Sequence, residues 1–238
     1  WKSVSQLLNA IMILFKMIER ALVPIGYPGS VAEEYFEYQF WDTLQGLCSY
    51  IRGIQCTSAL LETAGVGRAE ASAAAAAVAW VMRDGFASVA SLLFSACFGG
   101  KLDEAPKEWR LVADTCNDMA LTIDVLSPYI CGTSSSIMFI LITGISAALK
   151  TICGVAAGTS KAVISAHLAR ANNFGDVASK EAAQETLVTL IGLIIGVPFA
   201  RIEWLSLYVT LSVFFFSYLV TYLCQYQSCT VLKTKNTY

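Results

Sequence analysis

Charged side chains are scarce in this sequence. Asp, Glu, Lys and Arg make up 14% of its 238 residues, whereas a typical soluble domain carries about 25%. The net charge of −2 provides no basic surface for a nucleic acid, so we expect no nucleic-acid partner. A chain that is 56% apolar and so poor in charge is typical of a membrane protein with several spans.

Residues that build metal or catalytic centres are also few. The single histidine, His167, excludes a site made from several histidines, and none of the eight cysteines forms a CxxC pair. The sequence contains no Walker loop, no GxGxxG and no HExxH motif. We therefore expect no metal, no cofactor and no enzymatic activity.

One long stretch has no charge at all. Residues 204–232 are rich in Phe, Leu, Val and Tyr, and residues 205–223 supply the roughly 20 apolar positions that a helix needs to cross a bilayer. Residues 125–149 form a second uncharged stretch and residues 186–200 a shorter one. The alternative is a buried core helix of a soluble protein. We predict an all-α fold, a polytopic transmembrane bundle with five or six helices at membrane depth.

The rest of the chain is also expected to be helical. Residues 3–18 have apolar side chains at helical spacing, which predicts an amphipathic helix on a membrane or on the bundle. The two prolines and two glycines of residues 23–29 predict a rigid turn. Helices should follow over 35–61 and over 71–98, the second broken at 83–85, and another should begin near Pro106.

Three units are therefore predicted along the chain. They are an N-terminal amphipathic helix (residues 1–20), a helical membrane domain (21–200), and a C-terminal transmembrane helix with a short tail (201–238).

Ionisable side chains inside the apolar helices need a partner. A charge at the centre of a bilayer costs about 2.5–3.5 kcal/mol on insertion scales. Arg83 and Asp84 are adjacent and point about 100° apart on a helix, so each should pair with another helix. We expect Arg83 to meet Asp42, Asp114 or Asp118, and Asp84 to meet Arg52. Either a buried ion-pair network or a polar ligand site is then formed by Asp42, Arg52, Arg83, Asp84, Asp114, Asn117 and Asp118.

A metal site on this polar face is the weaker interpretation. Asp114, Asn117 and Asp118 present three oxygen-bearing side chains at i, i+3 and i+4. Their oxygens are too few for a complete shell around a divalent cation. An intrahelical pair between Arg110 and Asp114, one turn apart, explains much of the pattern.

Small residues predict where helices touch. Glycines spaced by four allow helix backbones to approach closely in a membrane. The sequence has two such pairs, Gly154/Gly158 and Gly192/Gly196.

Ordered motif blocks identify a family resemblance over about residues 20–200. The chain resembles the ROOT UV-B SENSITIVE (RUS) family domain. The blocks are Pro24-x-Gly26-Tyr27-Pro28-x-Ser30-Val31, Tyr38-Gln39-x-Trp41-Asp42-x-Leu44-Gln45, Arg83-Asp84-Gly85, Trp109-Arg110-Leu111-x-Ala113-Asp114-x-x-Asn117-Asp118-x-Ala120, Gly154-Val155-Ala156 with Lys161, His167-x-Ala169, Asn172-x3-Asp176-Val177-x2-Lys180 and Gln184-Glu185-Thr186.

The resemblance implies a helical integral membrane protein of eukaryotic organelles or endomembranes, and we expect an organellar location, in a mitochondrial inner or plastid membrane. Family members are linked to vitamin B6 homeostasis and auxin transport, and no catalytic residues come with the resemblance. One hypothesis is a structural or accessory subunit of an organellar membrane assembly, with the bilayer and other membrane subunits as partners. The alternative is a carrier or binding protein for a small anionic or amphiphilic metabolite, with Arg52 and Arg83 as the anion-binding groups.

Overall fold

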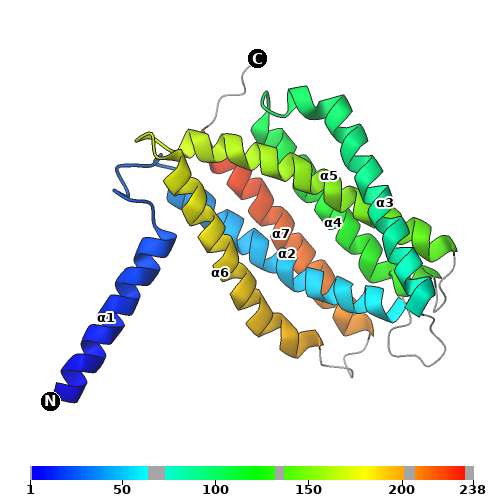
Figure 1. Cartoon of the computed structure of the whole chain (residues 1–238), viewed down its shortest axis with the longest axis horizontal. Coiled ribbons are helices and arrows are strands. Elements are labelled where there is room, and N and C mark those ends of the chain that lie inside the picture. Colours follow the sequence, from blue (N-terminus) through cyan, green and yellow to red (C-terminus); the bar gives the residue numbers. More distant parts are fainter. Residues whose placement is uncertain (1, 64–72, 132–136, 201–206, 234–238) are drawn as a thin grey trace.

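The computed structural model describes residues 2–63, 73–131, 137–200 and 207–233. These residues form seven α-helices and one short 3-10 helix, shown in Figure 1. The helices are α1 (Lys2–Leu22), α2 (Tyr35–Thr63), α3 (Ala73–Phe98), the 3-10 helix η1 (Gly99–Lys101), α4 (Pro106–Cys131), α5 (Ile137–Leu168), α6 (Phe174–Ala200) and α7 (Leu207–Val231).

The all-helical prediction is confirmed for the described residues, with one local error. The expected break at Arg83, Asp84 and Gly85 is wrong, because α3 continues through it. A glycine inside a helix costs only about 1 kcal/mol relative to alanine, which a helix of 26 residues tolerates. The prediction that a helix begins near Pro106 is confirmed, since proline at the first helical position gives up no intrahelical hydrogen bond.

Two described segments, Ala77–Lys101 and Ile137–Leu168, are long and apolar enough to cross a membrane. A core helix of a soluble protein passes the same test of length and composition. Here, however, few residues of the two segments are buried. In the most apolar 18-residue part of each segment the buried share is 11% for Ala77–Lys101 and 28% for Ile137–Leu168. Five or six spans are not confirmed, and the predicted span over 205–223 begins in residues 201–206, outside the described part of the chain.

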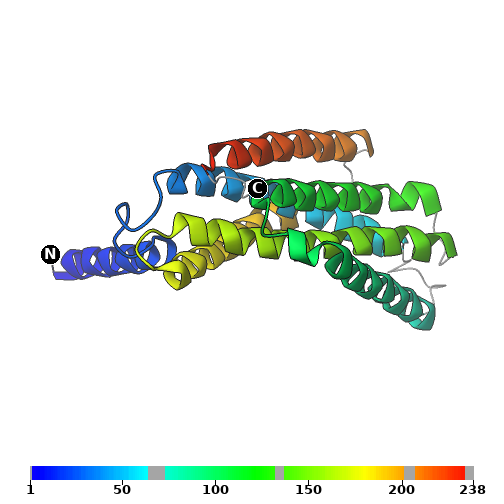
Figure 2. The same ribbon diagram turned by 90° about the horizontal axis from the view of Figure 1, so that it is seen from above.

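Helix α2 runs through the middle of the bundle and contacts α4, α6 and α7, whereas α5 contacts α3 and α4. Helix α1 touches α6 and then extends away from the bundle in both views (Figures 1 and 2). Phe214 of α7 is fully buried in one cluster with Cys56 of α2 and Leu121 of α4. The last helix therefore shares its core with the preceding helices.

One end of the bundle is tied together by the segment that precedes α2. Ala32 N–H donates to the carbonyl of Leu168 at 2.9 Å. The Glu34 carboxylate lies 2.9 Å from His167 Nε2 and accepts the backbone N–H of Lys233 at 3.4 Å. Burial alone would raise the pKa of Glu34, but its hydrogen bonds with His167 and with backbone N–H groups lower it. The charged Glu34 carboxylate therefore stabilises the folded state. Its contribution is complete above the ordinary pKa of a glutamate and is lost as pH falls through the lowered pKa of Glu34.

The two predicted glycine pairs have different surroundings. An added Cβ at Gly192 would overlap the ring of Tyr50, and one at Gly196 would overlap the end of Ile54, so α6 lies directly against α2. At Gly154 and Gly158 an added Cβ would meet no described atom within 4 Å.

We expect Gly192→Ala to lower the free energy of unfolding by about 1–2 kcal/mol, because the Tyr50 ring must move out of a packed position. Gly154→Ala is the matched control. It adds the same methyl group to open space, and it should leave stability unchanged or raise it by up to about 1 kcal/mol through helix propensity. Chemical denaturation of both variants, followed by tryptophan fluorescence, measures the difference. Equal losses in the two would contradict the close α2–α6 contact.

Candidate functional site

Buried carboxylates recur along one side of α4. Asp114, Asp118 and Asp124 are each at most 5% exposed, and a buried carboxylate needs a counter-charge or several hydrogen bonds. Each has a cationic partner. The pairs are Arg110–Asp114 within α4, Arg52–Asp118 between α2 and α4, and Lys150–Asp124 between α5 and α4.

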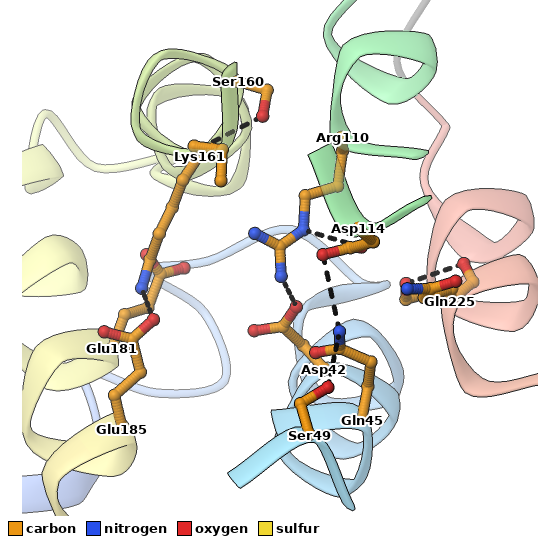
Figure 3. Close-up of polar contacts among 12 residues, drawn as sticks. Asp42, Gln45, Ser49, Arg110, Asp114, Ser160, Lys161, Glu181, Glu185 and Gln225 are labelled. Atoms are coloured by element: carbon orange, nitrogen blue, oxygen red, sulfur yellow. Dashed lines mark hydrogen bonds and ion pairs between the residues drawn. The ribbon is translucent and has the colours of Figure 1, made fainter. Parts of the chain in front are cut away.

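Arg110 is the centre of the first cluster, drawn in Figure 3. Its Nη2 donates to Asp42 Oδ1 at 2.7 Å, and its Nε lies 3.5 Å from Asp114 Oδ2. Gln45 Nε2 donates to Asp114 Oδ1 at 3.4 Å and to Ser49 Oγ at 3.5 Å. The intrahelical pair that the spacing predicted is confirmed, and Arg110 in addition joins α4 to α2.

A second polar cluster faces the first from α5 and α6 (Figure 3). Lys161 of α5 forms an ion pair with Glu185 of α6. Glu181, one turn earlier on α6 and 3% exposed, accepts hydrogen bonds from Gln39 Nε2 at 2.7 Å and from Ser165 Oγ. These contacts connect α2, α5 and α6 at the same level of the bundle.

The two clusters line one cavity of about 280 Å³ between α2, α4, α5 and α6. Its wall carries two cations, Arg110 and Lys161, and three carboxylates, Asp42, Glu181 and Glu185. Charges of both signs suit a small molecule that itself carries both signs, because each ligand charge then meets a counter-charge. The other lining residues are Gln39, Thr43, Gln45, Gly46, Tyr50, Gln184, Val188 and Thr189.

The predicted ion pairs across the bundle are wrong. Arg52 meets Asp118 instead of Asp84. Asp42 and Asp114 meet Arg110 instead of Arg83. The Arg83 guanidinium carbon lies 4.7 Å from the ring centroid of Trp80, one turn earlier on the same helix. Helix α3 packs mainly against α5. Its contacts with α4 are made near its C-terminal end, where Phe94 and Phe98 meet Trp109, away from Arg83 and Asp84.

Six of the seven predicted site residues do not line the cavity. Arg83 and Asp84 are on α3, and Asp84 is exposed beside a separate hollow of about 550 Å³ with Ser88 and Thr151. Asn117 is partly exposed on α4 and is not among the residues that line the cavity. Of the seven, the cavity wall contains only Asp42, and Asp114 contacts two lining residues, Arg110 and Gln45.

Sequence reasoning missed the half of the cavity that α5 and α6 provide. Glu181 and Gln184 were not among the predicted site residues, and both lie on α6, which begins at Phe174. A signal was available, because Lys161, Gln184 and Glu185 belong to the motif blocks of the family resemblance.

The described residues contain no group of three or more His, Cys, Asp or Glu side chains arranged to hold a metal ion. The three buried aspartates of α4 are instead paired with arginine and lysine. The described polar groups thus offer ion pairs and hydrogen bonds to a bound molecule.

Comparison with known proteins supports the family resemblance. Residues 10–237 match the family model described as the vitamin B6 photo-protection and homoeostasis domain. The chain is 36% identical over 224 residues to RUS family member 1 of Dictyostelium discoideum, an alignment that covers 93% of this chain and 42% of that relative. It is 35% identical over 219 residues to protein root UVB sensitive 3 of Arabidopsis thaliana, covering 89% and 48%.

A third relative is protein root UVB sensitive 2, chloroplastic, of Arabidopsis thaliana. It is 31% identical over 188 residues, covering 78% of this chain and 42% of the relative. The chain therefore spans less than half the length of these three relatives. No solved structure matches it.

Proposed function

Because this chain belongs to the root UV-B sensitive (RUS) family, we propose that it is a non-catalytic membrane protein that binds and carries a small metabolite with charges of both signs. The observation that carries the proposal is the cavity between α2, α4, α5 and α6, whose wall holds both cations and carboxylates. The family domain is named for vitamin B6. Vitamin B6 vitamers combine a basic ring nitrogen with an acidic phenol, and so match this wall.

Membrane insertion is part of the proposal. The low charge content and the poorly buried apolar segments Ala77–Lys101 and Ile137–Leu168 support a bundle with several spans. An organellar membrane, plastid or mitochondrial inner, is the proposed location, and one relative carries the word chloroplastic in its name.

The anion-binding groups that we propose differ from those that the sequence indicated. Arg52 is 0% exposed and is held by Asp118, so a ligand cannot reach it. Arg110 and Lys161 line the cavity instead, and each already faces a carboxylate that a ligand cation can share. A bound zwitterion would exchange ion pairs between wall residues for ion pairs between those residues and its own charges.

Lys161→Met tests the proposal without disturbing the fold. Lys161 pairs with Glu185, which is 62% exposed, and such surface pairs contribute at most about 1 kcal/mol to stability. We expect pyridoxal, pyridoxamine or pyridoxal 5′-phosphate to bind the purified chain in nanodiscs. The variant should weaken that binding roughly tenfold or more, since a charge-assisted hydrogen bond is worth about 1.5–3 kcal/mol. Isothermal titration calorimetry measures both affinities.

Asp84→Asn is the matched control, because Asp84 is a charged and exposed residue outside the cavity. It should bind every vitamer with unchanged affinity. The proposal fails if no vitamer binds the original chain, or if Lys161→Met and Asp84→Asn weaken binding equally.

An accessory subunit is the second candidate function, and the outer surface of α3 favours it. Large apolar side chains on this helix are exposed, among them Val78, Val81, Leu92 and Leu93. Exposed apolar patches of this kind mark sites of contact with another protein or with lipid. A native gel of gently solubilised membranes, with mass spectrometry of the band, distinguishes the two. If the protein migrates with a larger complex, the accessory-subunit function is supported. If it migrates by itself, that function is contradicted.

A further inference from the structure

The polar cavity adjoins a second, apolar one. This groove has a volume of about 470 Å³ and lies between the end of α1, the segment that follows it, and α2. Three residues, Gln39, Thr43 and Gln184, line both spaces and form their common wall. The remaining groove residues are almost all apolar or aromatic: Leu22, Val23, Pro24, Tyr27, Tyr35, Phe36, Phe40, Leu44 and Leu47.

Gln184 lies at the junction with one hydrogen-bonding atom unused. Its Nε2 donates to the carbonyl of Leu22 at 2.7 Å and to Tyr35 Oη at 3.4 Å. Its Oε1 is buried and has no hydrogen-bond partner among the described residues. A buried acceptor without a donor costs free energy. Because Gln184 lines both spaces, a turn of its side chain would present Oε1 to a ligand hydroxyl or N–H.

The groove opens away from the bundle. Phe36 and Phe40 line it and are 67% and 52% exposed, on the same side of α2. In the proposed membrane setting, these rings face acyl chains, and an apolar chain can enter from the side. The polar cavity lies beyond Gln39 and Gln184, at the inner end of this path.

We propose that the two spaces together bind one single-chain amphiphile with a zwitterionic head group, of the lysophosphatidylethanolamine class. Its phosphate would meet Arg110 and Lys161, its ammonium would meet the cavity carboxylates, its glycerol hydroxyl would donate to Gln184 Oε1, and its acyl chain would fill the groove. The combined volume is within the roughly 300–1,000 Å³ of ordinary ligand sites.

This inference rests on the proposed function, because it uses the same polar cavity, and it extends the ligand class. A vitamin B6 vitamer would occupy the polar cavity alone and leave the groove empty. A groove of apolar side chains beside a charged cavity instead matches a molecule that has an apolar part beside its charges.

The length of the acyl chain provides the test. Full-length chain in phosphatidylcholine nanodiscs is photolabelled with a diazirine lysophosphatidylethanolamine, and the label is competed with glycerophosphoethanolamine or with lauroyl, myristoyl and palmitoyl lysophosphatidylethanolamine. We expect competition to strengthen roughly fourfold for each methylene that leaves water. Partition into the bilayer gives the same gain, so the groove variants below decide how much of it the groove supplies. The head group without a chain should compete weakly, and the label should map to the groove-lining part of α2.

Groove variants separate this inference from the proposed function. Leu47→Trp and, as a second variant, Leu44→Trp fill the groove. They should weaken palmitoyl competition tenfold or more and leave binding of the head group alone unchanged. Leu92→Trp, at a position 72% exposed on α3, is the matched control and should have no effect.

Two results would overturn the proposal. If glycerophosphoethanolamine competes as well as the palmitoyl lipid, the groove takes no part and only the polar cavity remains supported. If neither competes and no vitamer binds either, the proposed function fails together with the inference.

Discussion

Replacing Arg52 with alanine is expected to lower the free energy of unfolding by about 3–5 kcal/mol, because it leaves a buried carboxylate without its counter-charge. Arg52 is 0% exposed and pairs with Asp118, which is 2% exposed. Its guanidinium carbon lies 5.7 Å from the ring centroid of Phe214 and 5.6 Å from that of Tyr218. The residue therefore joins α2, α4 and α7, and its loss should be measurable by chemical denaturation of the detergent-solubilised protein.

Arg83→Ala is the matched control for this prediction. Arg83 is partly exposed and stacks on Trp80 of its own helix, a contact worth about 0.5–1 kcal/mol at an exposed site. The double variant Arg52→Met with Asp118→Leu should recover much of the lost stability, since a buried ion pair can be replaced by apolar side chains at little cost. Equal losses for Arg52→Ala and Arg83→Ala would show that the pair with Asp118 is unimportant for folding.

Lys150→Met is expected to have the second largest effect, a loss of about 2–3 kcal/mol in the free energy of unfolding. Asp124, the partner of Lys150, is 0% exposed, and its Oδ1 has no hydrogen-bond partner among the described residues. Lys150 is 30% exposed, so it is less buried than Arg52, and its loss should cost less than Arg52→Ala. The same denaturation measurement applies.

A surface pair and a double variant test whether the loss comes from Asp124. Lys233 pairs with Glu33 at 3.3 Å, and both side chains are largely exposed. Lys233→Met removes an equivalent charge and should leave stability unchanged. Lys150→Met combined with Asp124→Leu should be more stable than Lys150→Met alone. If the double variant is less stable than the single one, the penalty does not arise from an unpaired carboxylate.

Features that depend on neighbouring residues in the chain were readable from the sequence. Apolar spacing predicted the N-terminal helix, and Pro106 marked the start of α4. The pair between Arg110 and Asp114 followed from their separation by one helical turn. The family was also predictable, because its motif blocks lie in order along the chain.

Partners that are distant in the sequence were not readable. Arg52 and Asp118 are 66 positions apart, and Arg110 and Asp42 are 68 apart. Each pairing depends on how the helices rotate and pack, and several arrangements satisfy the same charges. The sequence contains enough acids to pair with every arginine, and so it could not show that Arg83 would remain on the outside.

By itself, the sequence determined the helical class, the scarcity of charge and the family, because these follow from local hydrogen bonding, composition and motif order. Tertiary structure decided which charges line the cavity. It placed Lys161, Glu181 and Glu185 opposite Arg110 and Asp42, with a cavity between them. Of the two glycine pairs with the same spacing, Gly192/Gly196 lies at a close helix contact, whereas Gly154/Gly158 faces no described atom within 4 Å. Both outcomes depend on which faces of distant helices meet, and that is set by packing of the whole chain.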